Sequence, residues 1–188
     1  MARIPYPDPA ALSAPTRSLL ELVPPLNIFR MLAHAESLAG PYGGFGVALL
    51  TDLQLDTRLR ELAVLQVARQ AEAEYEWVQH VPIARAAGVG SDLIEVVRRG
   101  DLDSDLLTDR DRAVLRFTEQ VVRSPRVEDD TFRSLAAHLT YRQIVELLLV
   151  VGNYLMLARI MTCLDLEPDR PVESETIDAI TRSAGTSP

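Results

Sequence analysis

The sequence predicts an all-α protein, and three observations support this fold class. Apolar residues in the central part of the chain recur at three- and four-residue steps, the spacing of one helix face. Strong runs of alternating apolar and polar residues, which are typical of half-buried strands, do not occur. Residues that favour helix ends flank most of the apolar segments. We therefore expect helices nearly throughout positions 26–164.

The expected helices follow one another with short connections. A first helix over 28–38 is interrupted by the segment Gly40-Pro41-Tyr42-Gly43-Gly44, because glycine and proline disfavour helix interiors. A second begins after Asp56, whose side chain can accept a hydrogen bond from the first turn. The remaining helices are expected at 74–87, 91–100, 108–122, 128–138 and 140–161.

Side chains at the helix ends justify these boundaries. Thr108 with Asp111 resembles a capping box, and Thr140 with Gln143 is one. Ser91 is suited to the N-cap position of its helix. Gly88 and Gly100 can adopt the left-handed conformation that ends helices.

Composition divides the chain into three parts. Six of the 12 prolines lie in residues 1–25, which predicts an extended N-terminal arm over the core or over a neighbouring subunit, or a partly disordered leader. The helical domain spans 26–164. Residues 165–188 carry six acidic and two basic side chains, so this acidic C-terminal tail is expected to be a surface helix with a frayed end.

A faint internal repeat accompanies the helical pattern. At an offset of 50, eight positions between 60 and 97 match, including Ala63-Val64-Leu65 with Ala113-Val114-Leu115. Alanine-rich helices produce such matches easily, so a duplicated helical unit is a hypothesis. Glu76 and His80 have no counterparts at the offset positions, so a duplication does not extend to them.

The charged and sulfur-containing residues exclude several chemistries. All 19 basic residues are arginine, which excludes a Schiff-base lysine and a P-loop lysine. Cys163 is the one cysteine, so an intrachain disulfide, a zinc finger, a dithiol redox pair and chain-only iron–sulfur ligation are excluded as well.

Net charge and hydropathy indicate the expected surroundings. The net charge of −8 offers no excess of positive charge for a phosphate backbone, so no nucleic-acid partner is expected. The N-terminus lacks the apolar segment of a secretory signal, and the longest apolar stretch, 147–158, is shorter than the ~20 residues that span a bilayer. We expect a cytoplasmic protein without a membrane partner.

One helix carries the residues that suggest chemistry. Glu76 and His80 are four residues apart and share a helix face, with Ala73 and Trp77 beside them. Pro82 lacks an N–H group and is expected to bend the helix near His80, which opens space.

Two other interpretations of Glu76 and His80 compete with a catalytic one. The spacing is also consistent with a solvated surface pair that contributes a few tenths of a kcal/mol. A metal site formed with Glu61 needs further ligands that the sequence does not provide, so no metal is predicted. Patterns typical of zinc proteases and serine hydrolases are absent.

Three segments together resemble the carboxymuconolactone decarboxylase family, which includes the alkyl hydroperoxidase D branch. They are Arg60-Glu61-Leu62-Ala63-Val64-Leu65, Glu74-Tyr75-Glu76-Trp77-Val78-Gln79-His80 and the run 84–89. The blocks 24–34 and 150–159 extend the resemblance over nearly the whole chain. It implies an alkyl hydroperoxidase D-like helical bundle that forms homo-oligomers, as dimers, trimers or hexamers.

The redox residues of the peroxidase branch are missing. That branch has a glutamate, then after eleven residues Cys-x-x-Cys, and a histidine after three more. Here Glu61 and His80 match the outer positions, while Ala73 and Glu76 occupy the cysteine positions. Cys163 lies on another helix, so a thiol-dependent hydroperoxidase is the least favoured function.

The resemblance instead implies a cofactor-independent lyase, decarboxylase-like or isomerase, acting on a small organic acid or lactone. His80 would transfer a proton, Glu76 would orient the imidazole or carry a second proton, and Glu61 would hold the other ring nitrogen or titrate itself. Trp77, Ala73 and Arg60 are the candidate substrate-binding residues, with Arg30, Arg58, Arg85 and Arg159 as other candidate cations. The alternative is a non-catalytic ligand-binding or scaffolding member.

Overall fold

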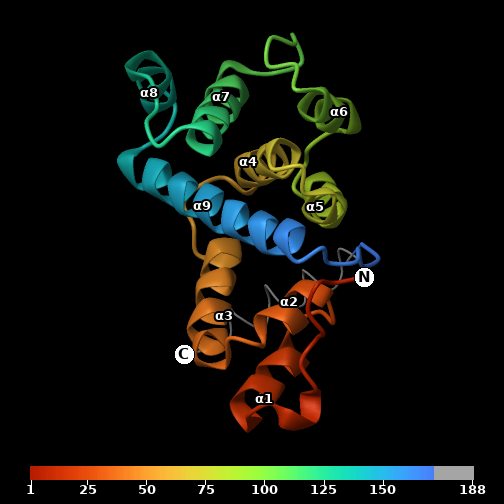
Figure 1. Cartoon of the computed structure of the whole chain (residues 1–188). Helices are drawn as coiled ribbons and strands as arrows, with labels where there is room; N and C mark the ends of the chain where they lie inside the picture. The colour runs from red at the N-terminus through yellow and green to blue at the C-terminus, as the bar shows by residue number, and fades with distance from the viewer. Residues whose placement is uncertain (172–188) are drawn as a thin grey trace.

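The computed structural model describes residues 1–171, and these residues form helices without any strand (Figure 1). The all-α prediction is therefore confirmed. Within the described residues, a short 3₁₀ turn, Pro9–Ala11, precedes nine α-helices: α1 (Ala14–Leu22), α2 (Asn27–Leu32), α3 (Glu36–Thr51), α4 (Thr57–Gln70), α5 (Glu74–Ala86), α6 (Ser91–Arg99), α7 (Asp109–Arg123), α8 (Asp129–Ala136) and α9 (Tyr141–Cys163).

Helix α4 forms the centre of the core. It packs against α5, α6, α7 and α9, and every residue from Leu59 to Ala68 is buried. A helix surrounded on all sides must also bury its polar residues, here Arg60, Glu61 and Gln66. The charged pair Arg60–Glu61 therefore needs partners inside the protein.

Most predicted helix ends are confirmed. The Asp56 side chain accepts the N–H of Leu59, and both capping boxes form. Gly88 and Gly100 have positive φ values of 87° and 70°, which glycine adopts without steric cost. Ser91 is not an N-cap but the first helical residue, with Gly90 preceding it.

The predicted break at Gly40–Gly44 is wrong. Helix α3 continues through Pro41, and the interruption lies earlier, between α2 and α3. Local propensity is overridden here by packing of α3 against α1. Gly43 contributes to that packing, because an added Cβ would lie 3.1 Å from a methyl group of Leu19.

The N-terminal segment is less extended than expected. It contains the 3₁₀ turn and α1, which starts next to Pro15, a residue that favours the first turn of a helix. The division of the chain at residues 25 and 164 stays a prediction. Residues 172–188, which include most of the expected tail helix, lie outside the described residues.

Both ends of the described chain meet. The N–H of Arg3 donates to the carbonyl of Leu164 at 2.8 Å, and the Tyr6 hydroxyl donates to Glu167 at 3.0 Å. The side chain of Asp169 then accepts hydrogen bonds from the Asn27 N–H and from the Tyr75 hydroxyl. Segment 164–170 therefore joins the N-terminal segment, α2 and α5.

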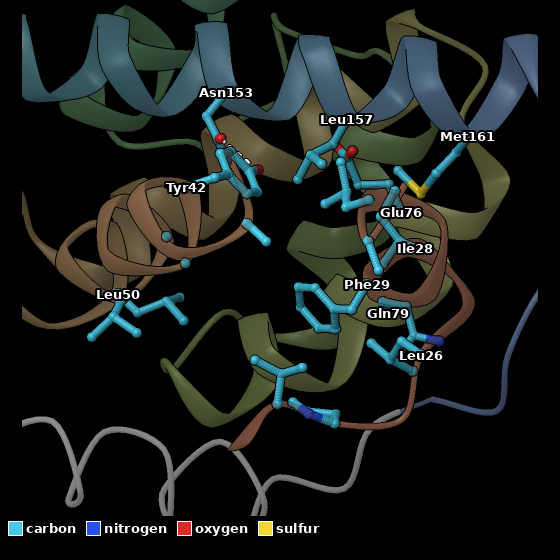
Figure 2. A pocket seen from close by; sticks show the side chains of 18 of the residues that line it. Leu26, Ile28, Phe29, Tyr42, Leu50, Glu76, Gln79, Asn153, Leu157 and Met161 are labelled. Atoms are coloured by element: carbon cyan, nitrogen blue, oxygen red, sulfur yellow. Dashed lines mark hydrogen bonds between the residues drawn. The ribbon is translucent and has the colours of Figure 1, made fainter. Parts of the chain in front are cut away.

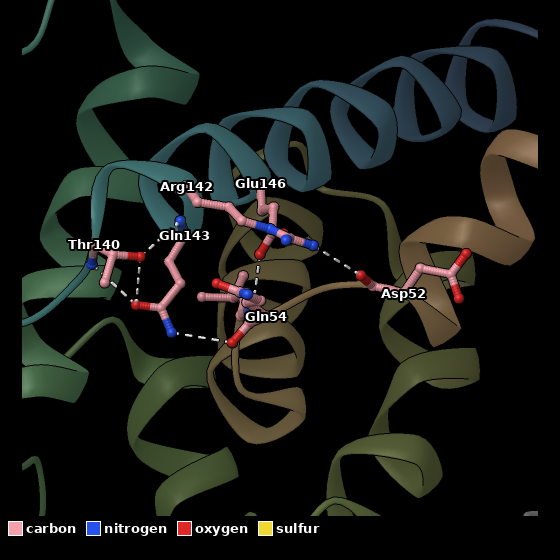
Figure 3. Close-up of polar contacts among 7 residues, drawn as sticks. Asp52, Gln54, Thr140, Arg142, Gln143 and Glu146 are labelled. Atoms are coloured by element: carbon pink, nitrogen blue, oxygen red, sulfur yellow. Dashed lines mark hydrogen bonds and ion pairs between the residues drawn. The ribbon is translucent and has the colours of Figure 1, made fainter.

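The start of α9 fixes the loop between α3 and α4 (Figure 3). Glu146 accepts hydrogen bonds from the N–H of Leu55 and from Arg142 Nε, both at 2.7 Å. The Gln143 side chain donates to the carbonyl of Gln54 at 3.0 Å. These contacts hold the α3–α4 loop against the first turns of α9.

Helix α9 is long and apolar enough to cross a membrane by length and composition alone, in contrast to the shorter stretch considered from sequence. Half of its most apolar window is nevertheless buried within the protein, as in the core helix of a globular domain. Its outward face exposes Val145, Leu148, Leu149 and Met156.

Candidate active site

A cavity of about 220 Å³ lies between the N-terminal helices and the core. Helices α1, α2 and α3 form one wall, and α5 and α9 form the other. Figure 2 shows lining side chains from α2, α3, α5 and α9. Most lining side chains are aliphatic or aromatic. Glu76, Gln79, His80 and Asn153 line the cavity on the α5 and α9 side, while Thr16 and Tyr42 add hydroxyl groups from α1 and α3. This is the usual composition of a small-molecule site.

Glu61 lies directly behind this wall, completely buried in α4. Its Oε1 accepts a hydrogen bond from Arg60 Nε and its Oε2 pairs with His80 Nδ1, both at 2.9 Å. Burial opposes ionisation, but the two partners outweigh it and hold the pKa of Glu61 below its usual value. Glu61 is therefore an ionised carboxylate inside the protein.

His80 connects Glu61 to the cavity. It lines the cavity wall, and its ring meets the edge of Tyr154 with centroids 4.8 Å apart. When Nδ1 carries the proton donated to Glu61, Nε2 is the nitrogen left to interact with a ligand. The predicted role of Glu61, holding one ring nitrogen of His80, thus has a geometric basis.

Glu76 has entirely different surroundings. It lines the cavity and is only 2 % exposed, yet neither carboxyl oxygen has a hydrogen-bond partner among the described residues. Burial, with the nearby negative charge of Glu61, raises the pKa of Glu76 well above its usual value. The cavity wall therefore contains a carboxyl group whose surroundings favour its neutral form, and Glu61, whose surroundings favour the ionised form, lies one layer deeper.

The three predicted substrate-binding residues do not line the cavity. Arg60 points to the end of α3, where it donates to the carbonyls of Leu49 and Leu50 at 3.2 and 2.8 Å. Trp77 packs in the core, and its ring lies under the guanidinium of Arg98. Ala73 is buried in the turn before α5, in a small cluster with Ala71 and Ala158.

Helix geometry explains why Trp77 and Arg60 face elsewhere. Trp77 directly follows Glu76, and Arg60 directly precedes Glu61. Each side chain therefore points about 100° away from that of the neighbouring glutamate around the helix axis. Among the other candidate cations, Arg58 forms a bidentate pair with Asp111, and Arg30 lies over the ring of Tyr6. No arginine lines the cavity in the part of the chain that the structure describes.

Sequence reasoning missed the polar pair that closes the cavity near α3. The Tyr42 hydroxyl donates to Asn153 Oδ1 at 2.8 Å, which joins α3 to α9 (Figure 2). Burial raises the pKa of Tyr42 to about 12, so its hydroxyl stays protonated. A signal existed in the sequence, because Asn153 is a polar residue within an apolar stretch of α9.

No group of three or more histidine, cysteine, aspartate or glutamate side chains within residues 1–171 is arranged to hold a metal ion. Cys163 is exposed and does not line the cavity. The positions that match the redox cysteines of the peroxidase branch hold a buried alanine and the cavity acid Glu76.

Residues 36–120, which include Glu61, Glu76 and His80, match the carboxymuconolactone decarboxylase family (CMD). This match supports a place for the chain in the family. Among curated proteins, none matches the sequence.

Solved structures of other family-like proteins share the fold. An uncharacterised peroxidase-related protein with an alkylhydroperoxidase AhpD core, from Ralstonia eutropha JMP134, is similar over 96 % of both chains, with a TM-score of 0.76 and 24 % identity. An uncharacterised peroxidase-related protein from Silicibacter sp. TM1040 has a TM-score of 0.74 and 20 % identity, over 89 % of this chain and 90 % of that one. The AhpD-like bundle expected from the sequence is therefore confirmed.

The debrominase Bmp8 also shares this fold. A variant of Bmp8 in complex with 2,3,4-tribromopyrrole has a TM-score of 0.68 and 18 % identity, over 90 % of this chain and 89 % of that one. Proteins with this helical bundle thus include one that binds a small halogenated ring.

Proposed function

We propose that this protein is an enzyme that acts on a small organic acid or lactone by general acid–base chemistry, without a cofactor. The observation that carries the proposal is the buried Glu61–His80 hydrogen bond, which ends at a cavity that also contains the unpartnered acid Glu76. A proton-transferring imidazole and a hydrogen-bond-donating acid in a mostly apolar cavity suit a reaction with an enolate-like intermediate.

The three residues have different roles in this proposal. Glu61 is a positioning residue, because it sets the orientation and tautomer of the imidazole without reaching the cavity. His80 Nε2 takes or delivers a proton. Glu76, in its neutral form, supplies a hydrogen bond to developing negative charge on a substrate oxygen.

Two reaction types fit these roles. In a decarboxylase-like lyase, the C–C bond to a carboxylate breaks, carbon dioxide leaves, and the resulting enolate is protonated by His80. In an isomerase, His80 removes a proton from one carbon and returns it to another. The small halogenated ring bound by Bmp8, a protein of the same fold, supports a small cyclic substrate.

The test is the His80→Gln variant, assayed with a panel of lactones and keto acids for carbon dioxide release and for isomerised product. We expect turnover to fall about 10²–10⁴-fold with the helical circular dichroism unchanged. His138→Gln is the matched control, because this histidine is exposed and lies outside the cavity. Full activity of the His80 variant would contradict the proposal.

A second candidate is a non-catalytic ligand-binding protein, which the largely apolar lining of the cavity also favours. Mass spectrometry of the ligand before and after incubation separates the two functions. Saturable binding with an unchanged ligand mass across the panel supports this candidate. Peroxidase activity that disappears in Cys163→Ser would instead support the thiol chemistry.

We also propose that the protein forms a homo-oligomer through the exposed apolar face of α9. Val145, Leu148 and Leu149 are 56, 41 and 47 % exposed on this helix, and an apolar face of this kind commonly covers a subunit interface. Light scattering is expected to give a multiple of the 20.8 kDa chain mass, reduced in Leu148→Glu/Leu149→Glu. A monomeric wild type would contradict this.

A further inference from the structure

Charge balance around the cavity bears on the kind of substrate that it accepts. A carboxylate that leaves water for a mostly apolar cavity needs a cation or several hydrogen-bond donors. Arg60, which adjoins Glu61 on α4, is already held by that carboxylate and by two carbonyls at the end of α3. The described part of the cavity wall contains an acid, Glu76, and no arginine.

The oxygens of Glu76 are the least satisfied polar atoms in this wall. Both oxygens are buried and without a hydrogen-bond partner. Tyr42 and Asn153, in the same wall, instead form a hydrogen bond with each other. An unpartnered buried polar group costs free energy, which a ligand that completes its hydrogen bonding recovers. The missing partner of a neutral carboxylic acid is an acceptor such as a carbonyl oxygen.

We propose that the cavity accepts an uncharged, largely apolar substrate whose carbonyl oxygen accepts a hydrogen bond from Glu76, and that it rejects carboxylates. This inference rests on the proposed acid–base function and narrows it. Of the two substrate classes, lactones fit and free acids do not. Of the two reaction types, proton-transfer isomerisation fits, because decarboxylation requires a carboxylate on the substrate.

The isomerisation is balanced without any other reactant. His80 Nε2 removes a proton next to the carbonyl, and the electron pair of that C–H bond moves to the carbonyl oxygen. Glu76 donates a hydrogen bond to this enolate oxygen. The isomerisation requires a C=C bond next to the carbon that loses the proton, so that the intermediate is a dienolate. The proton on His80 then returns to the far carbon of the dienolate, which restores the carbonyl and moves the C=C bond next to it.

Several ionisable groups lie around Glu76, and of these the Glu61 carboxylate raises its pKa. Glu61 and Arg60 lie on α4, His80 lies one turn along α5, Tyr42 faces it from α3 and Tyr154 from α9. Burial and the Glu61 charge together favour the protonated form of Glu76, in agreement with its proposed role as a donor.

The experiment compares acetophenone with benzoate, which have similar shapes but differ in charge. Binding to the wild-type protein is measured by calorimetry between about pH 5 and pH 9. We expect acetophenone to bind at least about tenfold more tightly than benzoate, because benzoate is desolvated without a counter-ion. Equal or tighter binding of benzoate, or no binding of acetophenone, overturns the inference.

Two variants assign the effect to Glu76. Glu76→Leu removes the donor and is expected to weaken acetophenone binding about tenfold. Glu76→Gln keeps an N–H donor of the same shape, so binding should be retained. In the wild type, acetophenone affinity should fall with rising pH, because Glu76 loses the proton that it donates. In Glu76→Gln, the affinity should not change with pH, because the amide does not titrate; His80 is present in both proteins. Equal pH dependence in both proteins overturns the inference.

The outcome is separable from that of the proposed function. Acetophenone binding does not require turnover, so the wild-type protein tests it independently of any reaction. If the binding pattern is observed but no lactone is converted, the proposed catalysis fails and the inference about the ligand stands. If His80-dependent conversion is observed only with carboxylate substrates, the inference fails and the catalysis stands.

Discussion

Two buried glutamates on neighbouring helices show how differently one residue type can be used. Glu61, within the α4 core, has a partner on each oxygen and a pKa below its usual value. Glu76, at the cavity wall on α5, has no partner on either oxygen among the described residues and a pKa well above its usual value. Both are almost fully buried. Their hydrogen-bond partners therefore decide which of the two is charged.

This difference has a chemical use. A pair of acids whose surroundings push their pKa values apart provides one permanent charge and one neutral donor at the same pH. In this protein the charged member is withdrawn from the cavity and acts through His80. The neutral member faces the ligand. The following predictions each change one side of this comparison.

Glu61→Ala is expected to have the largest effect. It leaves the Arg60 guanidinium and the His80 imidazole without their shared partner in the core. Removal of one member of a buried ion pair costs about 3–5 kcal/mol, so urea unfolding should show a large loss of stability. Glu61→Gln keeps the size of the side chain and isolates the effect of charge. If Glu61→Ala were as stable as the wild type, the contacts of Glu61 with Arg60 and His80 would contribute little to stability.

Glu76→Leu is expected to change stability in the opposite direction. A leucine of similar size removes two unpartnered oxygens, so the free energy of unfolding should rise by about 1–3 kcal/mol. The matched control is Glu146→Leu, which removes a carboxylate that accepts hydrogen bonds from Leu55 and Arg142 and should therefore destabilise. If Glu76→Leu also destabilises, then Glu76 has partners that this structure does not account for.

The raised pKa of Glu76 also predicts how stability depends on pH. Folding favours the protonated form, so the stabilising contribution is complete below the usual glutamate pKa of about 4.3 and is lost as pH rises through the raised folded value. Stability of the wild type, relative to Glu76→Gln, should therefore decline with rising pH over this window. Parallel pH profiles of the two proteins would argue that the pKa of Glu76 is normal.

Tyr42→Phe is expected to have the smallest effect. It removes one hydrogen bond between α3 and α9 and leaves the apolar cavity wall in place. The cost should be about 1 kcal/mol, measured by thermal unfolding with Tyr141→Phe, an exposed tyrosine, as the control. A loss of several kcal/mol would mean that the Tyr42–Asn153 contact holds the N-terminal helices in position.

The core helices and the Glu61–His80 pair could be anticipated from the sequence. Capping boxes at Thr108 and Thr140 are local signals that depend on residues within one helical turn. The pair could be anticipated for a different reason, because Glu61 and His80 match the spacing of a known family. The four-residue spacing of Glu76 and His80 was also consistent with a solvated surface pair. The burial of both residues excludes that interpretation.

Other features depended on contacts between distant segments. The continuation of α3 through Pro41 requires α1 to pack against it, and local propensity contains no information about α1. Arg60 was expected to meet a substrate, but the carbonyls at the end of α3 and the Glu61 carboxylate occupy its donors. Trp77 was assigned to the site because it is next to Glu76 in the sequence. Adjacent residues on a helix point to different faces, so Trp77 does not share the direction of Glu76.

The junction of the two chain ends has a consequence for the order of folding. Glu61 and His80 are separated by 19 residues, whereas the contacts of Ala2, Tyr6 and Asn27 with segment 164–170 span 140 to 165 residues. Contacts of such sequence separation form late, because closing a long loop is entropically costly. During synthesis, the N-terminal wall of the cavity can therefore make these contacts only after segment 164–170 has left the ribosome. The Glu61–His80 pair can assemble earlier, before these contacts fix the N-terminal wall.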